Sequence, residues 1–133
     1  MGTRTTLVAA LLLIVGVVVA MRYRSRSVVR EGGIYSVEIA DGKYGVAKVL
    51  ILEPGIVHVR TYAQRYSSRP ASVDEASLTM GTIHDKEFGV GHLPLQPAGF
   101  SAWQPVLIKV VQVRADELDG YEEWKRAGGG VWN

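Results

Sequence analysis

The sequence contains no cysteine, and it has no acidic residue in its first 30 positions. The lack of cysteine excludes disulfide bonds, thiolate zinc sites and cysteine nucleophiles. Residues 1–30 carry five of the 15 basic residues, so residues 31–133 carry ten basic and 13 acidic residues, a formal charge of −3. The net charge of +2 therefore originates in the N-terminal segment. A mildly acidic domain argues against nucleic acid as the partner, because nucleic-acid binding needs a basic face.

Catalytic signatures are scarce as well. The sequence has no nucleophile elbow and no paired-carboxylate motif. Its glycine-rich stretches, 89–91 and 128–130, do not stand between a strand and the start of a helix, as a phosphate-binding loop requires. We therefore predict a protein that is not an enzyme and holds no cofactor.

An apolar run without charge extends over residues 7–21, and Thr5 and Thr6 lengthen it. As a helix, residues 5–21 would span about 25 Å at ~1.5 Å per residue. This is the short limit for crossing a hydrocarbon core of ~30 Å and the long limit for the apolar region of a signal peptide. The run is apolar on all sides, whereas a buried core helix of a globular protein is usually apolar on one stripe.

The flanking charges favour an uncleaved membrane anchor. Only Arg4 and the terminal amine precede the apolar run, whereas Arg22, Arg24, Arg26 and Arg30 follow it. Positive residues stay on the cytoplasmic side, so we expect a single-pass membrane protein whose domain lies in the cytoplasm. An anchor with an external domain and an export signal cleaved after Ala20 are the alternatives. The expected organisation is an anchor with its basic stop in 1–24, a linker in 25–33 and one β-rich globular domain in 34–133.

Three strands are predicted at the start of this domain. Residues 34–39 alternate between apolar and polar side chains, residues 45–53 are apolar on both faces except at Lys48, and residues 56–62 alternate again. Turn signals at Asp41-Gly42 and Pro54-Gly55 separate them. Strands joined by tight turns form an antiparallel meander, with residues 45–53 in its centre.

The rest of the domain is less regular. Ser72 and Glu75 suggest a capping box for a short helical turn over 73–80, and the glycine-rich segment 81–97 reads as a long loop. Residues 103–114 read as a strand. A helix is expected from Asp116, its N-cap, to Arg126, with Gly128 ending it and Leu118, Tyr121 and Trp124 on one face.

These elements predict the fold class. It is α+β, with a small, mostly antiparallel β-sheet or an SH3-like barrel of four to six strands and a C-terminal helix. One N-terminal transmembrane helix precedes the domain.

The segment 58–69 is the candidate binding surface. Basic residues bind phosphates and aromatic rings stack on bases, so such a mixture suits single-stranded nucleic acid. It suits an acidic protein partner equally, and an amphipathic strand end followed by a solvated loop would give the same pattern. The candidate residues are His58, Arg60, Tyr62, Arg65, Tyr66 and Arg69.

A second set of residues, His84, Asp85 and His92, offers metal ligands within one segment. Their spacing matches no standard zinc pattern, and histidines of a loop often bond to the backbone instead. We therefore predict no metal site. A metal-dependent enzyme that uses the 84–92 loop remains an alternative, as does a small barrel that binds nucleic acid through 58–69.

The stretch GGIYSVEIADGKYGVAKVL, residues 32–50, resembles the opening hairpin of the immunity-protein-26-like family of small, β-rich bacterial proteins associated with polymorphic toxin systems. The matching features are Gly33, Tyr35, Val37, Asp41-Gly42, Tyr44-Gly45 and Val49. Tudor and other SH3-like barrels share the same rhythm, and members of the immunity family are generally soluble, whereas this chain has an apolar N-terminal run. The resemblance implies a binding protein without catalysis, and it assigns no functional residue.

Taken together, these patterns predict a membrane-anchored, non-catalytic binding module. Residues 5–21 would enter the membrane, and the loop-rich face formed by residues 63–100 would meet a protein partner.

Overall fold

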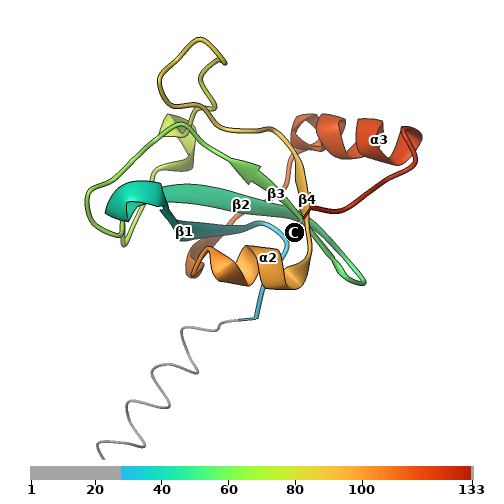
Figure 1. The fold of residues 1–133 in the computed structure, drawn as a ribbon, viewed down its shortest axis with the longest axis horizontal. Helices are drawn as coiled ribbons and strands as arrows, with labels where there is room; N and C mark the ends of the chain where they lie inside the picture. The colour runs from blue at the N-terminus through green and yellow to red at the C-terminus, as the bar shows by residue number, and fades with distance from the viewer. Residues whose placement is uncertain (1–27, 133) are drawn as a thin grey trace, which may run out of the picture.

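A computed structural model describes residues 28–132 (Figure 1). The predicted anchor, and with it the expected membrane topology, lies outside the described residues. Within residues 28–132, no helix is long and apolar enough to cross a membrane.

One five-stranded sheet organises the domain. Its strands are β1 (Gly33–Ile39), β2 (Lys43–Glu53), β3 (Ile56–Thr61), β4 (Leu93–Leu95) and β5 (Val106–Val110), in the spatial order β4-β3-β2-β1-β5. Every pairing is antiparallel. The predicted meander of the first three strands is confirmed, with β2 in the centre of the sheet. The short turn η1 (Ala40–Gly42) joins β1 to β2.

Helical elements complete the α+β fold. They are η2 (Glu75–Ser77), α2 (Pro97–Ala102), η3 (Ala115–Leu118) and α3 (Asp119–Arg126). The C-terminal helix is confirmed. Since β4 and β5 form the two ends of the strand order, the sheet described here is open and does not close into a barrel.

Several local predictions are wrong. Strand β4 and helix α2 lie in or next to the segment predicted as a loop. β4 is too short to show an alternating pattern, and α2 is a six-residue helix with a proline in its first turn. The predicted strand 103–114 is a strand only over Val106–Val110.

The helix caps also differ from those predicted. Asp74, not Ser72, caps η2, because its side chain accepts a hydrogen bond from the Ala76 N–H. Asp116 is not an N-cap. Instead η3 precedes α3, and the Glu117 carboxylate accepts the Arg114 N–H at 2.8 Å.

Side chains alternate between the two sides of the sheet and build two cores. On the α2 face, Phe100 of α2 is fully buried against strand residues that share this side. They are Tyr35, Val37, Ala47, Val49, Val57, Val59 and Leu95. On the opposite α3 face, Ile34, Val46 and Tyr62 are buried. Segment 63–92 supplies part of that second core, and rings of α3 cover His58 on β3.

Candidate functional site

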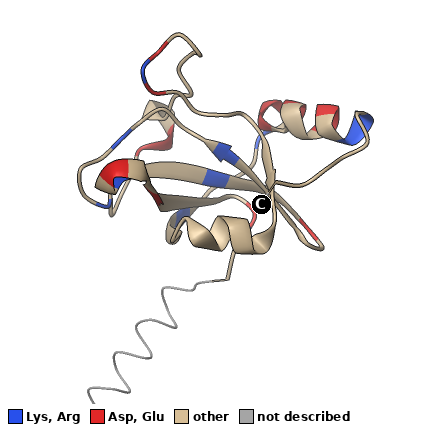
Figure 2. Ribbon diagram, in the orientation of Figure 1, with Lys and Arg blue, Asp and Glu red and all other residues tan. Residues whose placement is uncertain are grey.

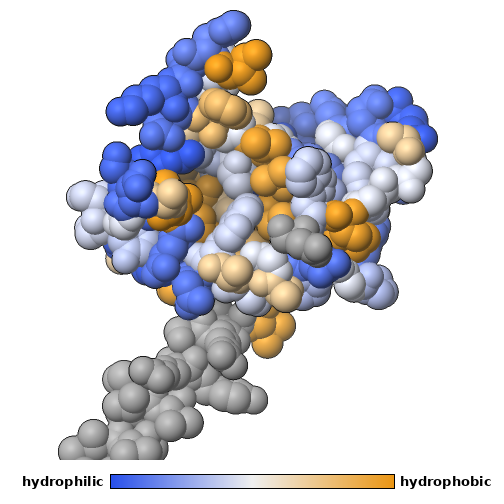
Figure 3. Space-filling model, in the orientation of Figure 1, coloured by the Kyte–Doolittle hydropathy of each residue, from blue (hydrophilic) through white to orange (hydrophobic). Residues whose placement is uncertain are grey.

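An open pocket of about 480 Å³ lies on the α2 face, at the end of the sheet next to η1. Its side walls are Val37, Ile39, Leu93 and Trp103, and buried Gly45 forms part of its floor. In Figure 3, hydrophobic residues are visible between the η1 turn at the left and β4. Pockets of roughly 300–1,000 Å³ with mainly apolar walls are typical ligand sites.

The pocket forms because β2 extends beyond its neighbour β3 at this end of the sheet. β3 ends at Thr61, whereas β2 continues to Lys43. The chain bends away after Tyr62 and returns at Tyr66, whose N–H and C=O both bond to the backbone of Tyr44 at 2.9 Å. Gly45 lies between these pairings and places no side chain in the gap. A Cβ at Gly45 would meet the Arg65 guanidinium and the Ile39 side chain at 3.7 Å, an ordinary contact distance.

Trp103 is held over the pocket by its backbone. Its carbonyl accepts the Glu38 N–H at 2.8 Å, and its ring packs edge-on against Phe100. The next residue, Gln104, has φ +52°. The other non-glycine residue of 28–132 with positive φ is Asp41, which follows the pocket residue Ala40. Both strained backbone positions therefore border the pocket, and such strain is often found at functional sites.

The loop 81–91 lies beside the pocket. Val90 exchanges hydrogen bonds with Thr61, which lines the pocket, and Glu87 pairs with Arg65 at 3.3 Å. The loop protrudes at the top of Figure 1, and Figure 2 shows acidic and basic residues mixed along it. Ile83 is 77% exposed and Phe88 is 42% exposed. Apolar side chains are therefore exposed to solvent on a loop next to the pocket.

Two charged residues, Glu38 and Arg65, line this pocket. The Arg65 Nη1 donates to the carbonyls of Tyr62 and Gln64, at 2.7 and 3.0 Å, and its Nε faces Glu87. These bonds neutralise the charge and use several of its donors. The guanidinium next to Gly45 is thus a fixed, planar wall.

The structure separates the residues predicted to bind a partner. His58 and Tyr62 are buried on the α3 face, and Arg60 lies 3.9 Å from the Glu117 carboxylate. Burial raises the pKa of Tyr62 to about 12. The side chains of His58 and Tyr62 are therefore not exposed, because His58 packs under rings of α3 and Tyr62 packs against Leu78 and Met80.

The remaining predicted residues lie near the other end of the sheet. Arg65 lines the pocket, and Tyr66 forms the bridge to Tyr44. Arg69 donates to both oxygens of Ser36 and stacks over the Tyr44 ring at 4.9 Å. Of the six candidates, Tyr62 and Arg65 line the pocket.

The three residues of the alternative metal site, His84, Asp85 and His92, are not grouped either. Asp85 accepts hydrogen bonds from the Thr82 N–H and hydroxyl, and the His84 N–H donates to the same hydroxyl. His92 instead stacks on His58 beside α3. Within the described part of the chain, no three His, Cys, Asp or Glu residues are grouped to hold a metal ion.

The pairing of His58 with His92 could not be seen in the sequence. His58 Nδ1 lies 2.8 Å from His92 Nε2, and His58 Nε2 lies 3.3 Å from Glu53. Tyr121 of α3 donates its hydroxyl proton to Glu53. Burial, and then repulsion from His58, lowers the pKa of His92 to about 4. The cluster therefore holds α3 on the sheet with a neutral His92.

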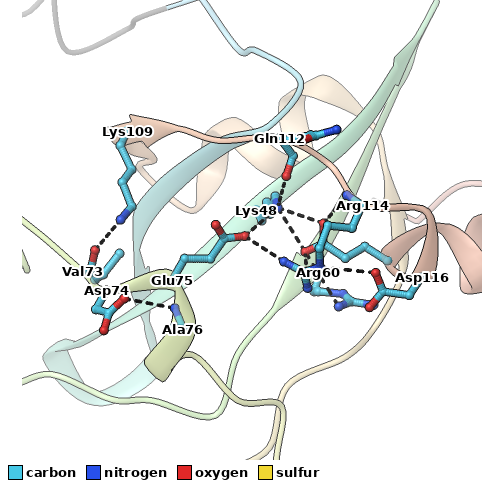
Figure 4. Close-up of polar contacts among 11 residues, drawn as sticks. Lys48, Arg60, Val73, Asp74, Glu75, Ala76, Lys109, Gln112, Arg114 and Asp116 are labelled. Carbon is cyan, nitrogen blue, oxygen red and sulfur yellow. Dashed lines mark hydrogen bonds and ion pairs between the residues drawn. The ribbon is translucent and has the colours of Figure 1, made fainter.

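A second buried polar cluster surrounds Lys48 (Figure 4). Its Nζ donates to Glu117, to Glu75 and to the Gln112 carbonyl, all within 3.0 Å. Figure 2 shows a basic residue inside each of β2 and β3. The sequence marked Lys48 only as an exception in an apolar strand. Its carboxylate partners come from η2 and η3, and Gln112 lies between β5 and η3, so the cluster joins the central strand to two distant segments.

Comparisons with protein-family models, curated proteins and solved structures gave no match for this chain. The fold and the site therefore define its class: an α+β domain with an apolar pocket beside a protruding loop. The resemblance of residues 32–50 to immunity proteins stays a prediction.

Proposed function

We propose that this protein is a membrane-anchored binding module that recognises a protein partner through its pocket face. We define the pocket face as the pocket walls Val37, Ile39, Leu93 and Trp103 together with the loop 81–91. The observation that carries the proposal is the attachment of this loop, with its exposed apolar side chains, to the pocket residues Thr61 and Arg65.

The chemistry of this face suits a protein partner. Ile83, Phe88 and Val90 are exposed hydrophobic residues on one short loop, and such patches often mark interaction sites. Around them lie paired charges such as Arg65 with Glu87. An apolar centre within a polar rim is the usual anatomy of a protein interface. The two buried polar clusters, around Lys48 and His58, satisfy their own hydrogen bonds and serve the fold.

The anchor in residues 5–21 would hold this face near a membrane, with the domain in the cytoplasm. In Figure 1 the described chain begins at the bottom and the loop 81–91 is at the top. The loop 81–91 of the pocket face is therefore on the opposite side of the domain from the point where the described chain begins.

Site-specific photo-crosslinking tests the proposal. A photoreactive residue is placed at Ile83 or Phe88 in the full chain, expressed in membranes of its own host. A matched control carries it at Val110, which is 51% exposed on edge strand β5. We expect one discrete protein adduct from the loop positions and none from Val110.

The design also has an internal test. Gly45→Val fills the pocket and should reduce the loop adduct. Ala127→Val should not, since Ala127 is exposed at the end of α3 and does not line the pocket. Absence of a loop adduct, or equal adducts from the loop and from Val110, would refute the proposed interface.

A further inference from the structure

We infer that the pocket takes an aromatic side chain of the partner. This inference rests on the proposed function and names the chemical group that the pocket recognises. Three features of the pocket carry it: an absent side chain, a tryptophan wall and a guanidinium wall.

The absent side chain is that of Gly45. Glycine inside a central strand weakens the strand, and it often marks close approach of a ligand or another chain. Gly45 has none of the positive φ that would demand glycine, and a Cβ there would meet its neighbours at 3.7 Å or more. Neither backbone conformation nor a steric clash therefore requires glycine. What glycine does provide is room on the floor of the pocket.

The tryptophan wall favours a ring. Trp103 is only partly buried although it packs against the α2-face core, so part of its indole remains open to a guest. Aromatic pairs gain attraction beyond the burial of area when they stack or meet edge to face. An aliphatic guest would gain the burial alone.

The guanidinium wall distinguishes an aromatic guest from an anionic one. Arg65 already donates to two carbonyls and faces Glu87, so a carboxylate guest would compete with bonds that exist. The flat face of a guanidinium still attracts an aromatic ring. Val37, Ile39 and Leu93 are apolar walls, and the lining residue Glu38 pairs with Arg69 at 3.5 Å. Aromatic residues are also the common anchors of protein interfaces.

Two small probes of matched shape test this inference. N-acetyl-phenylalaninamide carries the ring, and N-acetyl-cyclohexylalaninamide carries its saturated counterpart. The full chain is labelled with 5-fluorotryptophan, placed in lipid nanodiscs and titrated while ¹⁹F NMR follows its three tryptophans. Trp103→Phe assigns the Trp103 resonance.

We expect the phenylalanine probe to shift the Trp103 resonance saturably, with a dissociation constant on the order of 1 mM. The cyclohexyl probe should bind at least about threefold more weakly. Gly45→Val should abolish the shift, and Ala127→Val, at an exposed position after α3 that does not line the pocket, should preserve it. Arg65→Met, which keeps an apolar stem, should remove most of the preference for the aromatic probe.

Equal binding of the two probes would overturn the inference, as would a shift that survives Gly45→Val or no saturable shift at all. None of these results would affect the loop crosslinks, which test the proposed function separately. A crosslink from Ile83 together with equal probe binding would mean that the interface exists but that its pocket does not select a ring.

Discussion

Lys48 and Glu117 are buried against each other, with the lysine Nζ 3.0 and 2.9 Å from the two carboxylate oxygens. Lys48 is on the central strand, and Glu117 is in η3, close to the end of the chain. The same carboxylate accepts the Arg114 N–H, so one side chain both starts the C-terminal turn and attaches it to the sheet.

Breaking this pair should destabilise the domain strongly. Lys48→Met leaves a buried carboxylate, and Glu117→Leu leaves a buried ammonium group with Glu75 as its remaining acid. Removal of one partner of a buried ion pair costs about 3–5 kcal/mol. Urea denaturation followed by tryptophan fluorescence measures the loss in the free energy of unfolding.

The double variant Lys48→Met/Glu117→Leu is the control. Replacement of both partners by apolar residues is often close to neutral, so the double variant should be more stable than the sum of the single losses implies. Additive losses, or single losses below about 1 kcal/mol, would contradict a strong coupling between the two residues.

The sequence predicted the parts of the fold that depend on local signals. Alternation in residues 34–39 and the turns at Asp41-Gly42 and Pro54-Gly55 act over a few residues, so the meander was predicted correctly. The Lys48 cluster and the His58–His92 pair depend on contacts between distant segments, and no spacing in the sequence reveals them. The short β4 was missed because three residues, one of them Pro94, cannot show a period.

A fall in pH should lower the free energy of unfolding of the domain, because the folded state keeps His92 neutral. Its pKa is about 4 in the folded state, against an ordinary value of 6.5. Between pH 6.5 and 4 the unfolded chain binds a proton at this site and the folded chain does not, so stability falls as the pH falls through this window. The slope is at most about 1.4 kcal/mol per pH unit.

His92→Gln isolates this effect, because glutamine keeps a polar group near His58 and does not titrate. Denaturation curves between pH 6.5 and 4.5 should show a flatter pH dependence in the variant. The comparison stops at pH 4.5 because the Glu53 pKa, lowered chiefly by the hydrogen bond from Tyr121, adds a loss of stability below the ordinary carboxyl range. Equal slopes in the two proteins would show that His92 is not the titrating group.

Gln104→Gly should stabilise the protein. Gln104 has φ +52°, a left-handed conformation that costs an ordinary residue about 1 kcal/mol and glycine almost nothing. The greater freedom of glycine in the unfolded chain offsets part of this gain. We expect a net gain of about 0.5 kcal/mol, visible as a rise in the midpoint of thermal unfolding. A lower midpoint would mean that the Gln104 side chain contributes more than its backbone strain costs.

The pocket itself shows why the site was beyond sequence reasoning. Val37, Gly45 and Trp103 come from three separate elements, and each has an ordinary local role in a strand or at a helix end. The basic and aromatic pattern of 58–69 was visible, but alternation along β3 buries His58 and Tyr62. Composition identified residues capable of binding, and only the packing decides which of them line the pocket.

The attachment of loop 81–91 to the sheet depends on Gly89. A Cβ at this position would overlap the Thr61 carbonyl and crowd the backbone of Tyr62, and neither can move without disturbing β3. Gly89→Ala should therefore detach the loop, whereas Gly91→Ala should not.

Hydrogen exchange measures the detachment of the loop. The Thr61 N–H donates to the Val90 carbonyl, and the Val90 N–H donates to the Thr61 hydroxyl. Both amides should exchange at least about tenfold faster in Gly89→Ala. If the pocket face is the binding surface, the same variant loses the crosslink from Ile83 while the strands of the sheet remain protected. Slow exchange at Thr61 and Val90 in Gly89→Ala would show that the loop tolerates a side chain there and that close packing does not fix it.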